Sequence, residues 1–189
     1  MRLFVAIDLP SVIVKTITNL QNELRPFTQS LRWVNPNSAH LTLKFLGYVQ
    51  QQSISAIDRQ LQSIQAKPFK VQVSSVGFFP NNQTPRVLWL DVNSSECQEL
   101  YRKVEVSMTR LGFPAEKRGF IPHLTLARRR KDHRVDLSFV KTVMSLKEFD
   151  LNHFPAERFF LCRSLLTQGG TSYEKLFEYR LNSTIPELS

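Results

Sequence analysis

The sequence predicts an α+β fold in which two similar lobes share one groove. Patterns typical of strands and helices alternate along both halves of the chain. The same tetrapeptide, His-Leu-Thr-Leu, begins at His40 and again at His123. No linker rich in Gly, Ser or Pro separates the two halves, so residues 1–189 are expected to form a single domain of two intertwined lobes.

The opening residues predict a buried strand followed by a helix. Residues 3–9 form a short apolar run that a proline ends, which is typical of a buried strand. From Ser11, the expected N-cap, apolar residues recur with a period near ~3.6 residues. This pattern stops at Arg25 and Pro26, where the helix is expected to end.

The remaining elements follow from the same two patterns. Alternating apolar residues predict strands at residues 40–47, 69–79, 86–92, 123–129, 149–154, 158–166 and 173–181. Helical spacing predicts helices at residues 50–65, from Ser94 or Ser95 to Leu111, and at residues 137–146. Turns are expected at residues 80–85, which would form a hairpin, at Gly112, and at Gly169 and Gly170.

The composition favours a compact protein with a polyanionic partner. Hydrophobic residues make up 42% of the chain, which is enough to build a core without disulfides. Lys and Arg number 25 against 16 Asp and Glu, and the resulting formal charge of +9 makes nucleic acid the first candidate partner. The charge says nothing about the fold.

Cysteine usage and hydropathy argue against several classes of protein. Cys97 and Cys162 are far apart and match no metal-binding or CxxC spacing, so neither a zinc site nor a disulfide framework is expected. The apolar run at residues 3–7 is too short for a signal peptide or a membrane span, and no later segment is long enough. We expect a monomer in the reducing cytoplasm that makes no membrane contact.

The repeated tetrapeptide presents a histidine and a threonine together. Successive side chains of a strand point to opposite faces, so His40 and Thr42 share one face, as do His123 and Thr125 in the second copy. The leucines lie on the opposite, apolar face of each strand. If the two lobes are related by the repeat, two imidazoles face each other across the shared groove.

Two histidines across a groove suit a reaction that removes one proton and delivers another. An imidazole pKa near ~6.5 lets both protonation states exist at neutral pH. Phosphodiester cleavage is such a reaction, with one histidine activating the nucleophile and the other protonating the leaving oxygen. Threonine hydroxyls can donate hydrogen bonds to phosphate oxygens, whereas two histidines without Asp or Glu make a poor metal site. No metal or cofactor is expected.

A plain strand with two polar residues on its wet face is the alternative explanation of each tetrapeptide. For one copy that explanation is favoured, because short motifs match by chance. Two of the four histidines, however, begin the identical tetrapeptide, each soon after a loop that contains proline. The duplication therefore favours the catalytic interpretation.

With both motifs in place, the chain is similar to the 2H phosphoesterase superfamily, which carries two H-x-T-x motifs. It resembles in particular the RNA 2′,3′-cyclic phosphodiesterases, also named 2′-5′ RNA ligases. Four segments and the C-terminal part, spread over nearly the whole chain, carry the resemblance: MRLFVAIDLP, RWVNPNSAHLTLKFLG, GFFPNNQTPRVLWLDV, GFIPHLTLAR and LCRSLLTQGGTSYEKLFEYRL.

The resemblance implies a bilobal α+β fold with pseudo-two-fold symmetry, each lobe having an antiparallel sheet and flanking helices around a central, water-filled groove. It implies opening of a 2′,3′-cyclic phosphate at an RNA end to a 2′-phosphate, and in some members the joining of tRNA halves through a 2′-5′ linkage. It also implies that His40 is the proton donor and His123 the acceptor, and that Thr42 and Thr125 bind phosphate. The residues alone do not choose between the two histidines.

Basic residues near the motifs are candidate phosphate or RNA contacts. Strand phase puts Arg129 on the catalytic face, whereas the resemblance points to Arg128, and a bulge or the end of the strand would reconcile the two. Arg130 is a further candidate in the same run, with a solvated basic edge as the alternative. Lys44 continues the face of His40 and Thr42 and is expected to steer phosphate, unless it is only a solubilising charge.

Aromatic residues that stack on bases are the other expected RNA contacts. We retain Phe45 and Tyr173 as candidates, although strand phase gives Phe45 the position of a core residue. Phe78, Phe79 and Trp33 also lie near turns or strand ends, and for all of these core packing is the alternative.

Two other functions remain compatible with the sequence. One is a non-catalytic RNA-binding module, which would tolerate the loss of either motif histidine. The other is a phosphodiesterase for small cyclic nucleotides or an ADP-ribose cyclic phosphate. The positive charge favours an RNA end, including an end of a tRNA fragment, because each phosphate contact strengthens binding in a salt-dependent way.

Overall fold

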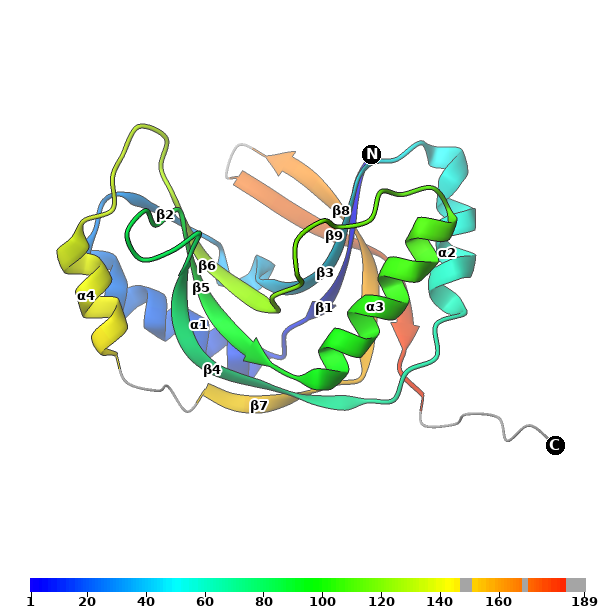
Figure 1. Ribbon diagram of the computed structural model, residues 1–189, viewed down its shortest axis with the longest axis horizontal. Coiled ribbons are helices and arrows are strands. Elements are labelled where there is room, and N and C mark those ends of the chain that lie inside the picture. Colours follow the sequence, from blue (N-terminus) through cyan, green and yellow to red (C-terminus); the bar gives the residue numbers. More distant parts are fainter. Residues whose placement is uncertain (147–150, 168–169, 183–189) are drawn as a thin grey trace.

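The computed structural model describes residues 1–146, 151–167 and 170–182, which fold around one antiparallel sheet (Figure 1). The strands follow the order β7-β4-β5-β6-β3-β1-β8-β9, and β2 pairs with β6. The strands are β1 (Arg2–Asp8), β2 (Leu31–Trp33), β3 (His40–Tyr48), β4 (Phe69–Phe79), β5 (Val87–Asn93), β6 (His123–Arg129), β7 (Leu151–Ala156), β8 (Arg158–Thr167) and β9 (Gly170–Arg180). The helices are α1 (Ser11–Leu24), α2 (Ile54–Gln62), α3 (Ser95–Arg110) and α4 (Leu137–Ser145), with 3-10 turns η1 (Arg25–Phe27), η2 (Pro36–Ser38) and η3 (Gln51–Ser53).

The sheet consists of two halves that meet at the motif strands. One half contains β3, β1, β8 and β9, and the other contains β6, β5, β4 and β7. Between the halves, β3 pairs with β6 through Leu41 and Leu124. The expected α+β arrangement of two lobes with antiparallel sheets is confirmed, and the two sheets are continuous with each other.

Helices α1 and α3 cross from one half to the other. Helix α1 follows β1 along the chain but contacts β7 of the opposite half, and α3 follows β5 but contacts β3. Helix α4 packs on β4, and α2 packs on α3 and β9. Figure 1 accordingly shows α1 and α4 at one end of the molecule and α2 and α3 at the other.

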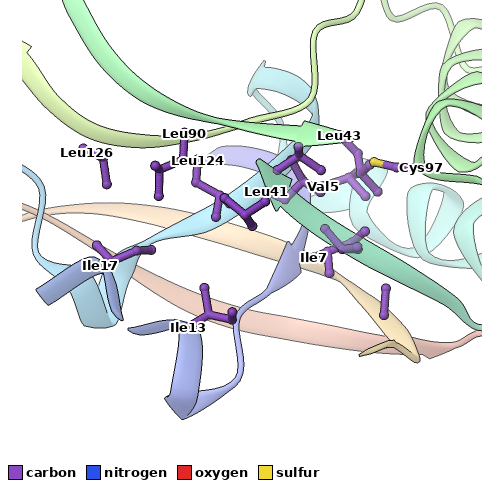
Figure 2. Close-up of a cluster of buried hydrophobic side chains, with 14 of the residues drawn as sticks. Val5, Ile7, Ile13, Ile17, Leu41, Leu43, Leu90, Cys97, Leu124 and Leu126 are labelled. Carbon is purple, nitrogen blue, oxygen red and sulfur yellow. The ribbon is translucent and has the colours of Figure 1, made fainter. Parts of the chain in front are cut away.

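A single large apolar core runs through both halves. It includes residues of both motif strands, and Leu41 and Leu124 at the junction have no exposed surface. Figure 2 shows these two side chains side by side at the centre of the cluster. Burying a leucine stabilises a fold by about 1.5–3 kcal/mol, so the apolar positions of the repeated tetrapeptide hold the two lobes together.

The structure agrees with the predicted elements and corrects some of their ends. Ser94 is the N-cap of α3, and its hydroxyl accepts a hydrogen bond from the amide of Cys97 at 3.1 Å. The prediction for Ser11 was wrong, because Pro10 occupies the N-cap position of α1 and Ser11 is already helical. The helix expected at residues 50–65 begins with a 3-10 turn and is α-helical only from Ile54 to Gln62.

Parts of two predictions lie outside the described residues. The strand predicted at residues 149–154 is described only from Leu151, where β7 begins. Of the turn predicted at Gly169 and Gly170, only Gly170 is described, as the first residue of β9.

Each motif strand contains a β-bulge at the last leucine of its tetrapeptide. In β3, Thr42 and Lys44 pair with adjacent residues of β1, so Leu43 is the extra residue. In β6, Thr125 and Ala127 pair with adjacent residues of β5, so Leu126 is the extra residue. A bulge reverses the faces of the residues that follow it, which decides where those side chains point.

Candidate active site

Both motif histidines are held in the same way at the start of their strands. The Nδ1 atom of His40 lies 2.9 Å from the carbonyl oxygen of Ser38, and that of His123 lies 2.8 Å from the carbonyl oxygen of Ile121. A carbonyl oxygen can only accept, so Nδ1 must carry the hydrogen in both rings. Each Nε2 is therefore the atom that gains or loses a proton.

The pairing of the motif strands sets the arrangement of the four polar side chains. Because Leu41 lies opposite Leu124 in antiparallel strands, His40 is next to Thr125 and Thr42 is next to His123. All four residues line one cavity of about 500 Å³. Two His-Thr pairs thus lie in one groove at the junction of the lobes.

The bulge in β6 turns Arg128 toward this groove. Ala127 is fully buried directly after the buried Leu126, and Arg128 lines the same cavity as both histidines. Of the two explanations offered for the conflict, a bulge or the end of the strand, the structure shows the bulge, which brings Arg128 rather than Arg129 to the face of the histidines. The guanidinium of Arg129 donates to the carbonyl of His133, and among the described residues that line the groove neither Arg129 nor Arg130 appears.

The bulge in β3 corrects the expected positions of Lys44 and Phe45. Lys44 is buried, and its Nζ atom lies 2.8 Å from both carboxylate oxygens of Glu105 and 3.0 Å from the carbonyl oxygen of Pro114. Its predicted place on the face of His40 and Thr42 was wrong, and its ammonium is bound to Glu105. Phe45, predicted by phase to be a core residue, is 63% exposed and lines the groove.

Aromatic rings surround His40. The rings of Phe4 and Tyr173 each lie 4.7 Å from its imidazole, centroid to centroid, and the Tyr173 contact is edge-on. Tyr173 lines the groove, as the sequence predicted. Phe4 was missed because it lies within the apolar run 3–7, although alternation places it on the strand face of the charged Arg2 and Asp8.

His123 has an equivalent aromatic setting. The ring of Phe79 lies 4.9 Å from its imidazole in an edge-on contact, and Trp89 lies 6.1 Å away. Phe79 and Trp89 stack on each other at 4.6 Å. Trp89 packs so closely on the opposite strand that a Cβ atom at Gly77 would lie 2.6 Å from its ring.

These surroundings lower the pKa of both imidazoles. For His40 the main cause is burial, and the charges of Arg128 and His123 lower its pKa further. The hydrogen bond to the Ser38 carbonyl acts in the opposite direction and raises the pKa. Burial also dominates for His123, again with Arg128 lowering the pKa and the Ile121 carbonyl raising it. Neutral imidazole is therefore favoured in both, and a bound anionic phosphate would offset the charge of Arg128.

Each crossing helix supports the bulge of the opposite motif strand. From α1, the Nε2 atom of Gln21 donates to the carbonyl oxygens of Val34 at 2.9 Å and Leu126 at 3.1 Å. From α3, Glu105 binds Lys44, which directly follows the bulge in β3. The side chains beyond the bulges thus depend on contacts made by helices of the other half.

A second cavity of about 780 Å³ adjoins the first and shares Thr42, Phe45, Phe79, Val87 and His123 with it. Within the three described segments, no group of three His, Cys, Asp or Glu side chains is placed to hold a metal ion. None of the helices in those segments is long and apolar enough to span a membrane.

The arrangement can supply acid and base catalysis in one groove. One neutral imidazole can take a proton through Nε2 while the other, once protonated, delivers one. Two threonine hydroxyls and the guanidinium of Arg128 provide hydrogen-bond donors for an anion between them. Such a set fits a phosphodiester.

Comparison with known proteins also indicates a phosphoesterase. Residues 7–89 match the model of the LigT like Phosphoesterase family. An RNA 2′,3′-cyclic phosphodiesterase of Methanocaldococcus jannaschii is 32% identical over 95% of this chain and 100% of its own length. One of Archaeoglobus fulgidus is 34% identical, covering 93% of this chain and 98% of that protein. Crystalline E. coli LigT with 3′-AMP superimposes with a TM-score of 0.78 at 26% identity, covering 95% of this chain and 97% of that one.

Proposed function

Since the chain belongs to the LigT-like phosphoesterase family of RNA 2′,3′-cyclic phosphodiesterases, we propose that it hydrolyses 2′,3′-cyclic phosphate ends of RNA to 2′-phosphates. The observation that carries the proposal is the pair of histidines whose Nδ1 atoms donate to backbone carbonyls and whose Nε2 atoms serve one groove. Hydrolysis of a cyclic phosphate needs one base and one acid, and this groove offers both.

In the proposed mechanism, His123 takes a proton from water and His40 protonates the departing 3′ oxygen. Formation of a 2′-phosphate requires the 3′ oxygen to leave, so His40 lies on the side of the ribose. Thr42, Thr125 and Arg128 donate hydrogen bonds to the phosphate oxygens as negative charge develops on them. Each histidine is expected to contribute about 10²–10⁴-fold to the rate.

The RNA contacts are part of the same proposal. Tyr173 lies against His40, and Phe45 lines the groove with most of its ring exposed, so both can stack on a base. Arg130 is exposed beyond the groove and would contact the RNA backbone. The charge of +9 supports an RNA, including a tRNA fragment, as the substrate. We propose that the protein acts in the cytoplasm as a monomer.

The test uses an RNA oligonucleotide that ends in a 2′,3′-cyclic phosphate, with EDTA present and with 2′- and 3′-phosphate products resolved. Wild-type protein should give the 2′-phosphate, whereas His40→Ala and His123→Ala should each lose at least about 100-fold in turnover. His133→Ala is the matched control, because this histidine is exposed and its imidazole contacts the backbone carbonyl of Lys131. Near-normal turnover of either motif variant would refute the two-histidine mechanism.

A small nucleotide is the second candidate substrate, because the similar E. coli LigT has been crystallised with 3′-AMP. The same assay with a mononucleoside 2′,3′-cyclic phosphate distinguishes the RNA end from the small nucleotide as the preferred substrate. A kcat/KM at least as high as that of the oligonucleotide would favour the small substrate. If the oligonucleotide binds and neither substrate is converted, the protein is a binding module.

A further inference from the structure

The groove of the two histidines extends beyond His40 toward the start of β1. The part that lies there, called the Arg2 end below, is lined by Arg2, Ser164, Thr171 and Tyr173. The described lining of the second cavity, which includes His123, contains none of these four residues. The Arg2 end therefore lies on the side of the groove away from the second cavity.

Strand pairing brings these side chains together. Arg2 of β1 lies opposite Ser164 of β8, which lies opposite Tyr173 of β9, and directly opposite residues share a face of the sheet. Phe4 is two residues after Arg2 on the same face, and its ring lies 4.7 Å from the imidazole of His40. Arg2 thus begins about 7 Å along β1 from a side chain that contacts a motif histidine.

The backbone at Arg2 is held on both sides. Arg2 lies opposite Tyr48 of β3 on one side and opposite Ser164 of β8 on the other. Just before it, the amino group of Met1 donates to the carbonyl oxygen of Val49 at 2.7 Å, and the amide of Val49 donates to the carbonyl oxygen of Met1 at 2.8 Å. The guanidinium is therefore presented to the groove from a fixed position.

The charges at the Arg2 end suit an anion. Arg2 is exposed, and within the described segments no carboxylate forms an ion pair with it. Arg163, next to Ser164 in the chain, lies on the opposite face of β8 and pairs with Glu174 at 3.6 Å. Ser164 and Thr171 add hydroxyl donors, and the described lining of the first cavity contains no Asp or Glu. A cation and two hydroxyls without an acidic neighbour favour a phosphate.

The reaction supplies a phosphate for this position, in an argument that rests on the function proposed above. Since His40 protonates the departing 3′ oxygen, the terminal ribose lies on the His40 side. The next charged group of the RNA is the phosphodiester that joins this ribose, through its 5′ oxygen, to the preceding nucleotide. On the side of His40 that faces away from the second cavity, this phosphodiester meets the Arg2 end.

We infer that Arg2, with the hydroxyls of Ser164 and Thr171, binds the phosphodiester on the 5′ side of the terminal nucleoside. A mononucleoside cyclic phosphate lacks this group, so the contact makes the enzyme prefer an RNA end to a small cyclic nucleotide. The contact is the same for every RNA sequence, because a phosphate carries no information about the bases. Arg2 thereby determines substrate specificity from outside both motifs.

The experiment compares three substrates that end in a 2′,3′-cyclic phosphate. They are a dinucleotide with an ordinary phosphodiester, the same dinucleotide with an uncharged methylphosphonate in its place, and a mononucleoside. A 2′-O-methyl group on the upstream ribose of both dinucleotides protects the linkage itself. Wild-type kcat/KM should be about tenfold higher for the phosphodiester than for the methylphosphonate, as expected for one charge-assisted contact.

Arg2→Gln should remove this preference. The ratio of the two dinucleotides should fall to about one, while kcat/KM for the mononucleoside stays within about twofold of wild type. The slope of log kcat/KM against log salt concentration for the phosphodiester should become shallower by about 0.7, the value for one contact to a single strand. Ser164→Ala, which removes a neutral donor, should lower the ratio by about threefold.

Arg163→Gln is the matched control, because this arginine lies next to Ser164 but on the opposite face of β8. It should leave both the ratio and the salt dependence unchanged. Turnover of the mononucleoside serves in each variant as the reference for folding and for the chemical step.

The outcomes separate this inference from the proposed function. A wild-type enzyme that opens a cyclic phosphate without preferring the phosphodiester to the methylphosphonate overturns this inference alone. The same holds if Arg2→Gln keeps the wild-type ratio, or if it slows all three substrates equally, since Arg2 would then act on the fold or on the reacting phosphate. An enzyme that opens none of the three substrates overturns the proposed function, and this inference with it.

Discussion

Phe45 and Arg128 occupy equivalent positions in the two halves of the molecule. Each lies five residues after its motif histidine, each follows a bulge, and each lines the groove. The repeat therefore ends in an aromatic ring on one strand and in a cation on the other. Near-symmetric strands thus place different side chains in the groove, whose lining also includes Arg2 of β1.

The pH dependence of kcat/KM should reflect the lowered pKa of both histidines. In the proposed mechanism the base of the free enzyme, His123, must be neutral, so activity falls as pH drops through its pKa. The acid, His40, must be protonated, so activity falls as pH rises through its pKa. Because both lie below the ordinary ~6.5, kcat/KM should be greatest below about pH 6.5. Initial rates at low substrate concentration test this, and an optimum above pH 7 contradicts it.

Arg128→Gln should move the whole pH profile toward alkaline values. The charge of Arg128 disfavours both imidazolium ions, so its removal raises the pKa of His40 and of His123. Loss of a charge-assisted contact to phosphate should also reduce kcat/KM by roughly 10–100-fold. Arg129→Gln is the control, since its guanidinium is bound to the His133 carbonyl, and it should not move the profile.

Glu105→Gln should destabilise the fold far more than a surface substitution. It leaves the ammonium of Lys44, 5% exposed, without its carboxylate, and breaking a buried pair in this way costs about 3–5 kcal/mol. Urea unfolding measures the change. Glu99→Gln, in an exposed pair with Lys103, should cost less than about 1 kcal/mol.

A double variant separates the buried charge from the packing. Lys44→Met with Glu105→Leu removes both ions and should recover most of the stability lost in Glu105→Gln. If the double variant is as unstable as Glu105→Gln, the ion pair is not the cause.

Gly77→Ala should disturb the stacked rings of Phe79 and Trp89 beside His123. The added methyl group would lie 2.6 Å from the Trp89 ring, which must shift together with Phe79. Overpacking of this kind costs about 1–3 kcal/mol in the free energy of unfolding, and turnover should fall because both rings contact His123. Gly119→Ala meets open space and should change stability by less than about 0.5 kcal/mol. Equal stability of the two variants would argue against a close approach at Gly77.

Sequence patterns located the polar pairs of the motifs but not the side chains that follow them. Alternation holds from His40 to Leu43, and the letters HLTLKF continue the same pattern without a break. The extra residue in each strand is visible only in its pairing with β1 or β5, which is a contact between distant segments. Lys44 was therefore placed on the wrong face, and strand phase pointed to Arg129, whereas the resemblance had pointed to Arg128, which lines the groove.

Phe4 and Glu105 illustrate two other limits. Phe4 lies within an apolar run whose burial was predictable, but its contact with His40 joins segments distant in the sequence and was not. Glu105 lies on α3 of one half and binds Lys44 on β3 of the other half. Nothing in the sequence around Glu105 indicates this partner.

The crossing of α1 and α3 makes this chain the equivalent of a domain-swapped dimer joined into one polypeptide. Each half contributes a helix that supports the motif strand of the other half. Separating the halves would therefore remove these helix contacts from both motif strands. The two motif strands are thus joined by their direct pairing and by a helix contributed from each side. Under the proposed function, substrate would enter and product would leave along the groove beside this junction.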